Sequence, residues 1–151
     1  MRGDVTLMEL DDVHILSVQG CVIQISKALL KAGANVDYMG ARPYSSVFME
    51  ARSHCDVLFA LERSKVRIFG QVAQLFVFPG SEVIIEKDAY VSNIYKVKAP
   101  RGSKHRRTKL TISKDAYTME QLTVTLDSAV NLILSSTNNE VDPMVGEKEE
   151  L

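Results

Sequence analysis

Tryptophan is missing from this sequence, and aromatic residues make up only 7% of it. The 151 residues include only two cysteines and three histidines. Cys21 and Cys55 are too few for the disulfide framework of a small secreted domain, so we expect reduced thiols. No run of 18 or more apolar residues occurs, and the acidic N-terminal segment lacks the apolar core of a signal peptide. These absences predict a soluble intracellular protein.

Motifs of catalysis and metal binding are also missing. The sequence has no glycine-rich phosphate loop, no nucleophile elbow, no HExxH and no paired-cysteine zinc motif. His54 and Cys55 are adjacent, but no further ligands follow at a spacing that would complete a metal site. We therefore predict a non-catalytic binding protein with no catalytic residues, no metal and no cofactor.

Charge is nearly balanced overall but unevenly distributed. The net charge is -1, yet the stretch from Lys96 to Lys114 holds eight lysines and arginines and no acidic residue. Residues 140–151 hold five acidic residues and one lysine. We accordingly divide the chain into an acidic lead-in at 1–12, a folded unit at 13–135 and a disordered acidic tail at 136–151. The basic stretch predicts local contact with a polyanion.

Residues 65–91 carry the clearest strand pattern. Val66 and Ile68 alternate with Lys65, Arg67 and Phe69, which is the two-residue period of a sheet with one buried face. The polar face carries the aromatic ring of Phe69 between a cation, Arg67, and an amide, Gln71, so a base could stack on the ring while the cation contacts a phosphate. The alternative is that another part of the chain covers Phe69.

Further strands are expected at residues 13–25, 46–52 and 108–112, and residues 56–62 are interpreted as a strand or a short helix. Gly20 predicts a bulge or sharp bend in the first of these, as at the corner of a small barrel. Residues 26–46 are interpreted as a connection and residues 92–107 as a solvent-exposed loop. We identify no internal repeat in this pattern, which predicts a mainly β fold of about five strands.

A helix is expected at residues 119–134. Thr118 and Gln121 fit a capping box, and apolar residues recur at steps of three and four. Other apolar residues lie off that stripe, so the helix should be covered on more than one side. We expect a second protein subunit to dock there, through the face formed by Leu122, Leu126, Val130 and Ile133.

The strand KVRIFGQV, followed by a turn and by SEVIIEKDAYV, resembles the oligonucleotide-binding barrel, or OB fold. The sequence Gly80-Ser81-Glu82-Val83 is similar to a strand entry in bacterial single-strand-binding proteins. The late helix resembles that of the replication protein A middle subunit and of similar telomere-capping subunits. Barrel proteins of the kinetoplastid RNA-editing complex are a further resemblance. This implies a five-stranded OB-type Greek-key barrel with a C-terminal α-helix.

The resemblance implies a non-catalytic subunit of a heteromeric complex of the telomere, replication or repair type, which binds single-stranded DNA or RNA. Its expected location is the nucleus, or alternatively the mitochondrion, without a membrane partner. One alternative is a protein-interaction scaffold that does not contact nucleic acid, and another is a subunit of an RNA-editing or RNA-processing complex. Tyr44 is a further stacking candidate. The candidate nucleic-acid-binding residues are Lys65, Arg67, Phe69, Tyr90, Lys104, Arg106, Arg107 and Lys109.

Overall fold

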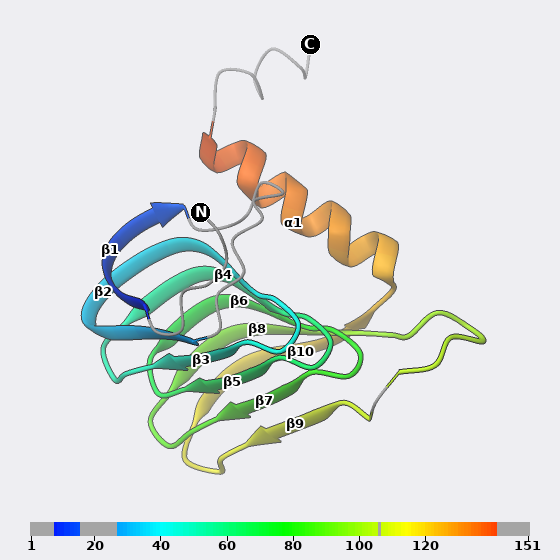
Figure 1. The fold of residues 1–151 in the computed structure, drawn as a ribbon, viewed down its shortest axis with the longest axis horizontal. Helices are drawn as coiled ribbons and strands as arrows, with labels where there is room; N and C mark the ends of the chain where they lie inside the picture. The colour runs from blue at the N-terminus through cyan, green and yellow to red at the C-terminus, as the bar shows by residue number, and fades with distance from the viewer. Residues whose placement is uncertain (1–7, 16–26, 106, 142–151) are drawn as a thin grey trace.

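The computed structural model describes residues 8–15, 27–105 and 107–141, with the side chains of 28–105 and 107–135. These residues form a parallel β-solenoid of about four coils followed by one helix (Figure 1). The elements are β1 (Met8–Ile15), β2 (Lys27–Ala41), β3 (Ser46–Met49), β4 (His54–Ala60), β5 (Lys65–Ile68), β6 (Gln71–Val77), β7 (Glu82–Ile85), β8 (Tyr90–Val97), β9 (Lys109–Ile112), β10 (Tyr117–Val124) and α1 (Leu126–Val141).

Every strand pairing among the described residues is parallel, and the strands form two facing layers. One layer has the order β10-β8-β6-β4-β2 and the other has the order β2-β3-β5-β7-β9. The 15-residue strand β2 bends and belongs to both layers, and β1 pairs with it. Figure 1 shows both layers progressing in the same direction along one axis, from β2 to β9 and β10. The predicted Greek-key barrel is therefore wrong, since such a barrel is antiparallel in most of its pairings.

Each coil places equivalent residues above one another. In the second layer Ser46 pairs with Lys65, Lys65 with Glu82, and Glu82 with Lys109, which are separations of 19, 17 and 27 residues. The additional residues of the last coil form the loop 98–108 between β8 and β9, which projects to one side in Figure 1. The central part of the basic stretch is thus an insertion in an otherwise regular coil, whereas Lys96 lies in β8 and Lys109 in β9.

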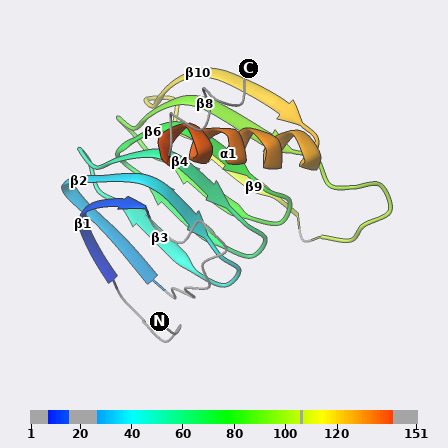
Figure 2. The ribbon, with the colours of Figure 1, turned by 90° about the horizontal axis from the view of Figure 1, so that it is seen from above.

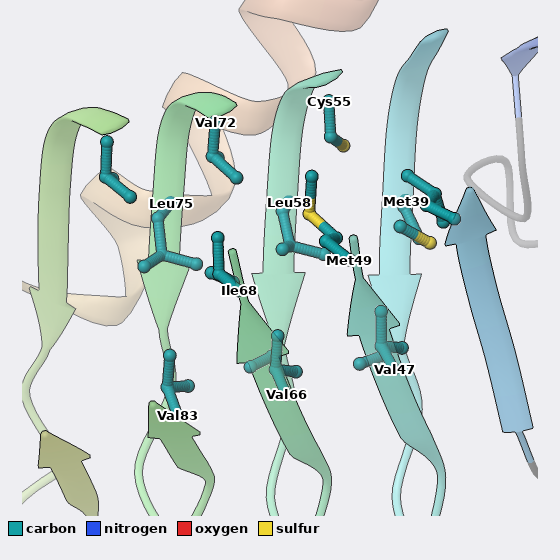
Figure 3. Close-up of a cluster of buried hydrophobic side chains, with 14 of the residues drawn as sticks. Met39, Val47, Met49, Cys55, Leu58, Val66, Ile68, Val72, Leu75 and Val83 are labelled. Atoms are coloured by element: carbon teal, nitrogen blue, oxygen red, sulfur yellow. The ribbon is translucent and has the colours of Figure 1, made fainter. Parts of the chain in front are cut away.

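The core of the solenoid is a set of apolar columns that run along its axis (Figure 3). Each column holds one inward-facing residue from every coil, so the same kind of side chain packs on itself from coil to coil. Burying an aliphatic side chain stabilises a fold by about 1.5–3 kcal/mol, and each coil contributes several. Two columns in the second layer are Val47, Val66 and Val83, and Met49, Ile68 and Ile85.

Buried serines close one corner of three successive coils. The side chains of Ser45, Ser64 and Ser81 are almost fully buried, and each hydroxyl donates to the carbonyl oxygen three residues before it. The residue before each serine has a positive φ, with values of 69° at Tyr44, 67° at Arg63 and 84° at Gly80. The same carbonyl oxygen also accepts the backbone N–H of the serine, so the hydroxyl adds a second hydrogen bond to each turn and is itself satisfied in the interior.

A second apolar cluster lies outside the solenoid, between the first layer and α1. Figure 2 shows the helix lying across the outer face of this layer. Ala129 and Ile133 pack there against Phe76, Phe78 and other residues of the layer. Phe76 in turn stacks on Tyr95 of the next coil, with 4.6 Å between ring centroids. The contact with α1 therefore accounts for the burial of Phe76 and Phe78 on the outer face of this layer.

The predicted boundaries of the helix are wrong. The helix begins at Leu126, and residues 117–124 form β10, so Leu122 lies in a strand. The proposed capping box at Thr118 and Gln121 does not exist. Instead, Thr125 caps the helix by accepting a hydrogen bond from the Ser128 N–H at 3.1 Å.

Two more segments differ from the expectations. Residues 26–46 were predicted to be a connection, but residues 27–41 form β2, the longest strand. β1 covers residues 8–15, so it crosses the boundary at residue 12 between the predicted lead-in and the predicted folded unit, and α1 extends into the predicted tail as far as Val141. Most of the predicted strand at 13–25, including Cys21, lies within residues 16–26, which are outside the described part of the chain. The predicted tail lies outside the described part from residue 142 onward.

Candidate binding surfaces

The outer face of β3, β5 and β7 carries an apolar groove of about 410 Å³. Leu29, Phe48 and Ile84 supply its apolar surface, and the side chains of Lys65 and Arg67 line it as well. These residues point outward because they alternate with the core residues of the same short strands. The groove therefore combines apolar contact area with two exposed cations.

Arg67 and Phe69, two predicted nucleic-acid contacts, are engaged within the chain. The ring of Phe69 packs against Phe48 at 5.4 Å between centroids, and the Arg67 guanidinium lies over both rings at 5.3 and 5.8 Å. The Arg67 Nε donates to a carboxylate oxygen of Glu86 at 2.5 Å. Phe69 is half-buried. Because the Arg67 guanidinium lies over its ring, a base would have to displace Arg67 to stack on that face. The alternative that other residues cover Phe69 therefore holds in part.

Four other cations gather around a small cleft at the serine corner, which we call the basic cleft. Arg63, Lys65, Arg107 and Lys109 line it, beside the buried Ser64 and Ser81. Lys65 and Lys109 are 44 residues apart, but the register places each of them next to Glu82. The predicted residues Lys65, Arg107 and Lys109 are thus brought together, and Arg63 is an addition that the sequence interpretation missed.

The remaining predicted contacts lie elsewhere. Tyr90 begins β8 in the other layer, where its ring stacks on Tyr117 at 6.5 Å and its hydroxyl donates to the Met119 sulfur at 3.3 Å. Lys104 is exposed in the loop 98–108, where His105 lies 3.5 Å from Glu62. Arg106 lies outside the described residues.

The C-terminal end of the solenoid is open in the part of the chain that the structure describes. β9 pairs only with β7, and β10 pairs only with β8. The N–H groups of Lys109 and Ser113 donate to carbonyl oxygens of the preceding coil. By the alternation of a parallel strand, the N–H and C=O groups of Leu110 and Ile112 point away from β7. Leu110 and Ile112 are only half-buried, whereas Val83 and Ile85 one coil earlier are 0% exposed.

The four residues of the predicted partner-binding face differ in how far they are exposed to solvent. Ile133 is buried against the solenoid, whereas Leu126 and Val130 remain about 40% exposed, as does Leu122 in β10. The docking of a second subunit through this face stays a prediction.

Cys55 is the buried thiol of the core. Burial raises the pKa of this thiol well above its usual range, and the nearby Asp56 carboxylate adds to the shift. The thiol stays protonated, so it is a packing residue and not a nucleophile.

No group of three or more histidine, cysteine, aspartate or glutamate side chains within the described ranges could hold a metal ion. Among the same residues, no helix is long and apolar enough to cross a membrane.

Comparison of the chain with protein-family models, with curated proteins and with solved structures finds no match. The binding surfaces must therefore be interpreted from their own chemistry. Three features stand out: the open C-terminal end, the basic cleft and the outer groove.

Proposed function

We propose that the protein is a non-catalytic assembly module whose open C-terminal coil stacks on a second copy of the chain. The observation that carries this proposal is the pair of strand edges at β9 and β10, together with the half-buried core residues between them. Unpaired strand edges readily pair with other strands, and soluble proteins usually block or cover them. Here α1 lies over the outer face of one layer and leaves the end uncovered (Figure 2).

A second copy fits this end better than an unrelated strand. The end surface has two strand edges on either side of an apolar interior, so a partner must supply two edges at the same separation. The same end of another copy supplies both, and in a two-fold arrangement each edge meets an equivalent one. Stacking would complete the backbone hydrogen bonds of Leu110 and Ile112 and bury their side chains.

Replacing Ile112 with lysine tests this function. The charge would lie without a counter-charge at the centre of the interface, where an uncompensated buried charge costs about 3–5 kcal/mol. We expect the dissociation constant of the assembly to rise by about 100-fold or more. Sedimentation velocity over a concentration series should show a larger species for the unmodified chain and a 16.8 kDa monomer for Ile112→Lys.

Thr111→Lys is the matched control, because Thr111 lies on the same strand and faces outward. This variant adds the same charge and should assemble as the unmodified chain does. Far-UV circular dichroism checks that both variants keep the solenoid. An unmodified chain that stays monomeric at every concentration, or equal effects of the two lysines, would contradict the proposal.

A further inference from the structure

The basic cleft concentrates positive charge that the described residues neutralise only in part. Arg63, Lys65, Arg107 and Lys109 are all exposed, and none of them forms an ion pair with another residue in the described ranges. Arg67, only two residues from Lys65, is by contrast paired with Glu86. The single acidic side chain that lines the cleft is Glu82, which the strand register places between Lys65 and Lys109. Four cations against one carboxylate make a site for an anion of more than one charge.

The cleft is small, with a volume of about 70 Å³. This volume suits a single phosphate-sized group and excludes a bulky ligand. Its walls come from three successive coils, since Arg63 and Lys65 belong to one corner and Lys109 to a strand two coils further. The geometry is therefore held by the solenoid ladder and by the buried hydroxyls of Ser64 and Ser81.

An aromatic platform lies beside these cations. Tyr44 occupies the equivalent corner one coil before Arg63, and its N–H donates to the Arg63 carbonyl at 3.1 Å. The Arg63 guanidinium lies 5.4 Å from the centre of the Tyr44 ring, and Tyr44 is still 74% exposed. Unlike Phe69, the Tyr44 ring has most of its surface available to a ligand.

We propose that this corner binds single-stranded nucleic acid, with a backbone phosphate in the basic cleft and an adjacent unpaired base on Tyr44. A cation cluster next to an exposed ring matches the chemistry of such a strand, because every nucleotide supplies one phosphate charge and one stacking face. The exposed Lys98 and Lys104 of the neighbouring loop extend the positive surface beyond the cleft. Across residues 27–135 the sequence has sixteen lysines and arginines against ten acidic residues, a net charge of +6.

The proposal is tested with a fluorescein-labelled oligothymidylate and its oligouridylate counterpart, by anisotropy over a salt series. If the cleft neutralises one phosphate and Lys98 and Lys104 neutralise one each, the slope of log K against log salt concentration should be about -2.1, or roughly -0.7 for each phosphate. The double variant Arg63→Gln/Lys65→Gln should lose the phosphate of the cleft, which reduces the slope to about -1.4, and should weaken binding by about tenfold or more. The double variant Lys87→Gln/Lys114→Gln removes the same charge from exposed positions at the opposite corner and should change neither quantity by as much.

Two single substitutions separate the parts of the site. Tyr44→Ala should weaken binding by about 5- to 100-fold with little change in salt slope, because stacking on a ring releases no counterions. Glu82→Gln should tighten binding, since it removes the carboxylate from the cleft. If the two charge-removing double variants lose oligonucleotide affinity equally, binding depends on the overall positive charge and not on the cleft, which would overturn the proposal. So would a slope near zero, or tighter binding to phosphopeptides or anionic vesicles than to the oligonucleotides.

Discussion

Replacing Leu75 with alanine should lower the free energy of unfolding by about 2–5 kcal/mol. Leu75 is 0% exposed and lies in the column of the first layer that contains Met39, Leu58 and Ile94. Its removal would leave a cavity with the column intact on either side. Neighbouring coils are held in place by their own ladders, so the cavity should collapse only partly. Chemical denaturation monitored by circular dichroism measures the loss.

Leu122→Ala provides the control for that experiment, since it removes the same atoms from an exposed position of β10. Its effect should stay within about 0.5 kcal/mol, as is usual at surface sites. Similar losses at the two leucines would mean that the apolar columns are not the main source of stability.

Adding a single methyl group at Gly70 should destabilise the fold by about 3 kcal/mol or more. A Cβ atom there would lie 2.5 Å from the Ser53 Oγ, 2.6 Å from the Ser53 carbonyl oxygen and 2.8 Å from the Glu50 carbonyl oxygen. Two of these three atoms belong to the backbone of the preceding coil, so they cannot move aside without separating the coils. The Gly70→Ala variant should show a lower melting temperature and a lower denaturant midpoint.

Gly102→Ala makes the same chemical change in the exposed loop 98–108, where no atom lies within 4 Å of the added Cβ. Its φ of 81° leaves only the penalty of the left-handed conformation, about 1–2 kcal/mol. A Gly70 variant that is no less stable than the Gly102 variant would contradict the close approach of the two coils at this corner.

Several strands were predictable because alternation alone specifies them. The expected strand at 108–112 agrees with β9, and Val66 and Ile68 face the core as their spacing indicates. Alternation does not reveal the direction of the neighbouring strand, however. A parallel solenoid and an antiparallel barrel both produce one apolar and one polar face, so the local pattern could not separate them.

The repeat that separates these two folds is present in the sequence but irregular. Ser45, Ser64 and Ser81 each begin the pattern Ser-x-Val-x-Met/Ile, at separations of 19 and 17 residues. Unequal coil lengths and the insertion in the last coil obscure this period. The sequence Gly80-Ser81-Glu82-Val83, interpreted as a feature of single-strand-binding proteins, is one copy of the repeat.

The candidate sites were less predictable than the strands. Lys65 and Lys109 flank Glu82 only because of the register between coils that are distant in sequence. The engagement of Arg67 by Glu86 depends on the same register. The solvent-exposed loop predicted at residues 92–107 needed only charge and turn residues, and the structure confirms it for residues 98–105 and 107. Residues 92–97 were wrongly assigned to this loop, because they belong to strand β8.

Parallel stacking of successive coils is the central claim, and methyl nuclear Overhauser effects measure it directly. Within each pair of parallel strands the difference between contacting residue numbers stays constant, whereas in an antiparallel hairpin their sum stays constant. We predict strong contacts from the Val66 methyl groups to Val47 and Val83, which lie 19 residues before and 17 residues after it. Contacts of Val66 that instead mirror across a hairpin turn, with none to Val47 and Val83, would contradict the solenoid.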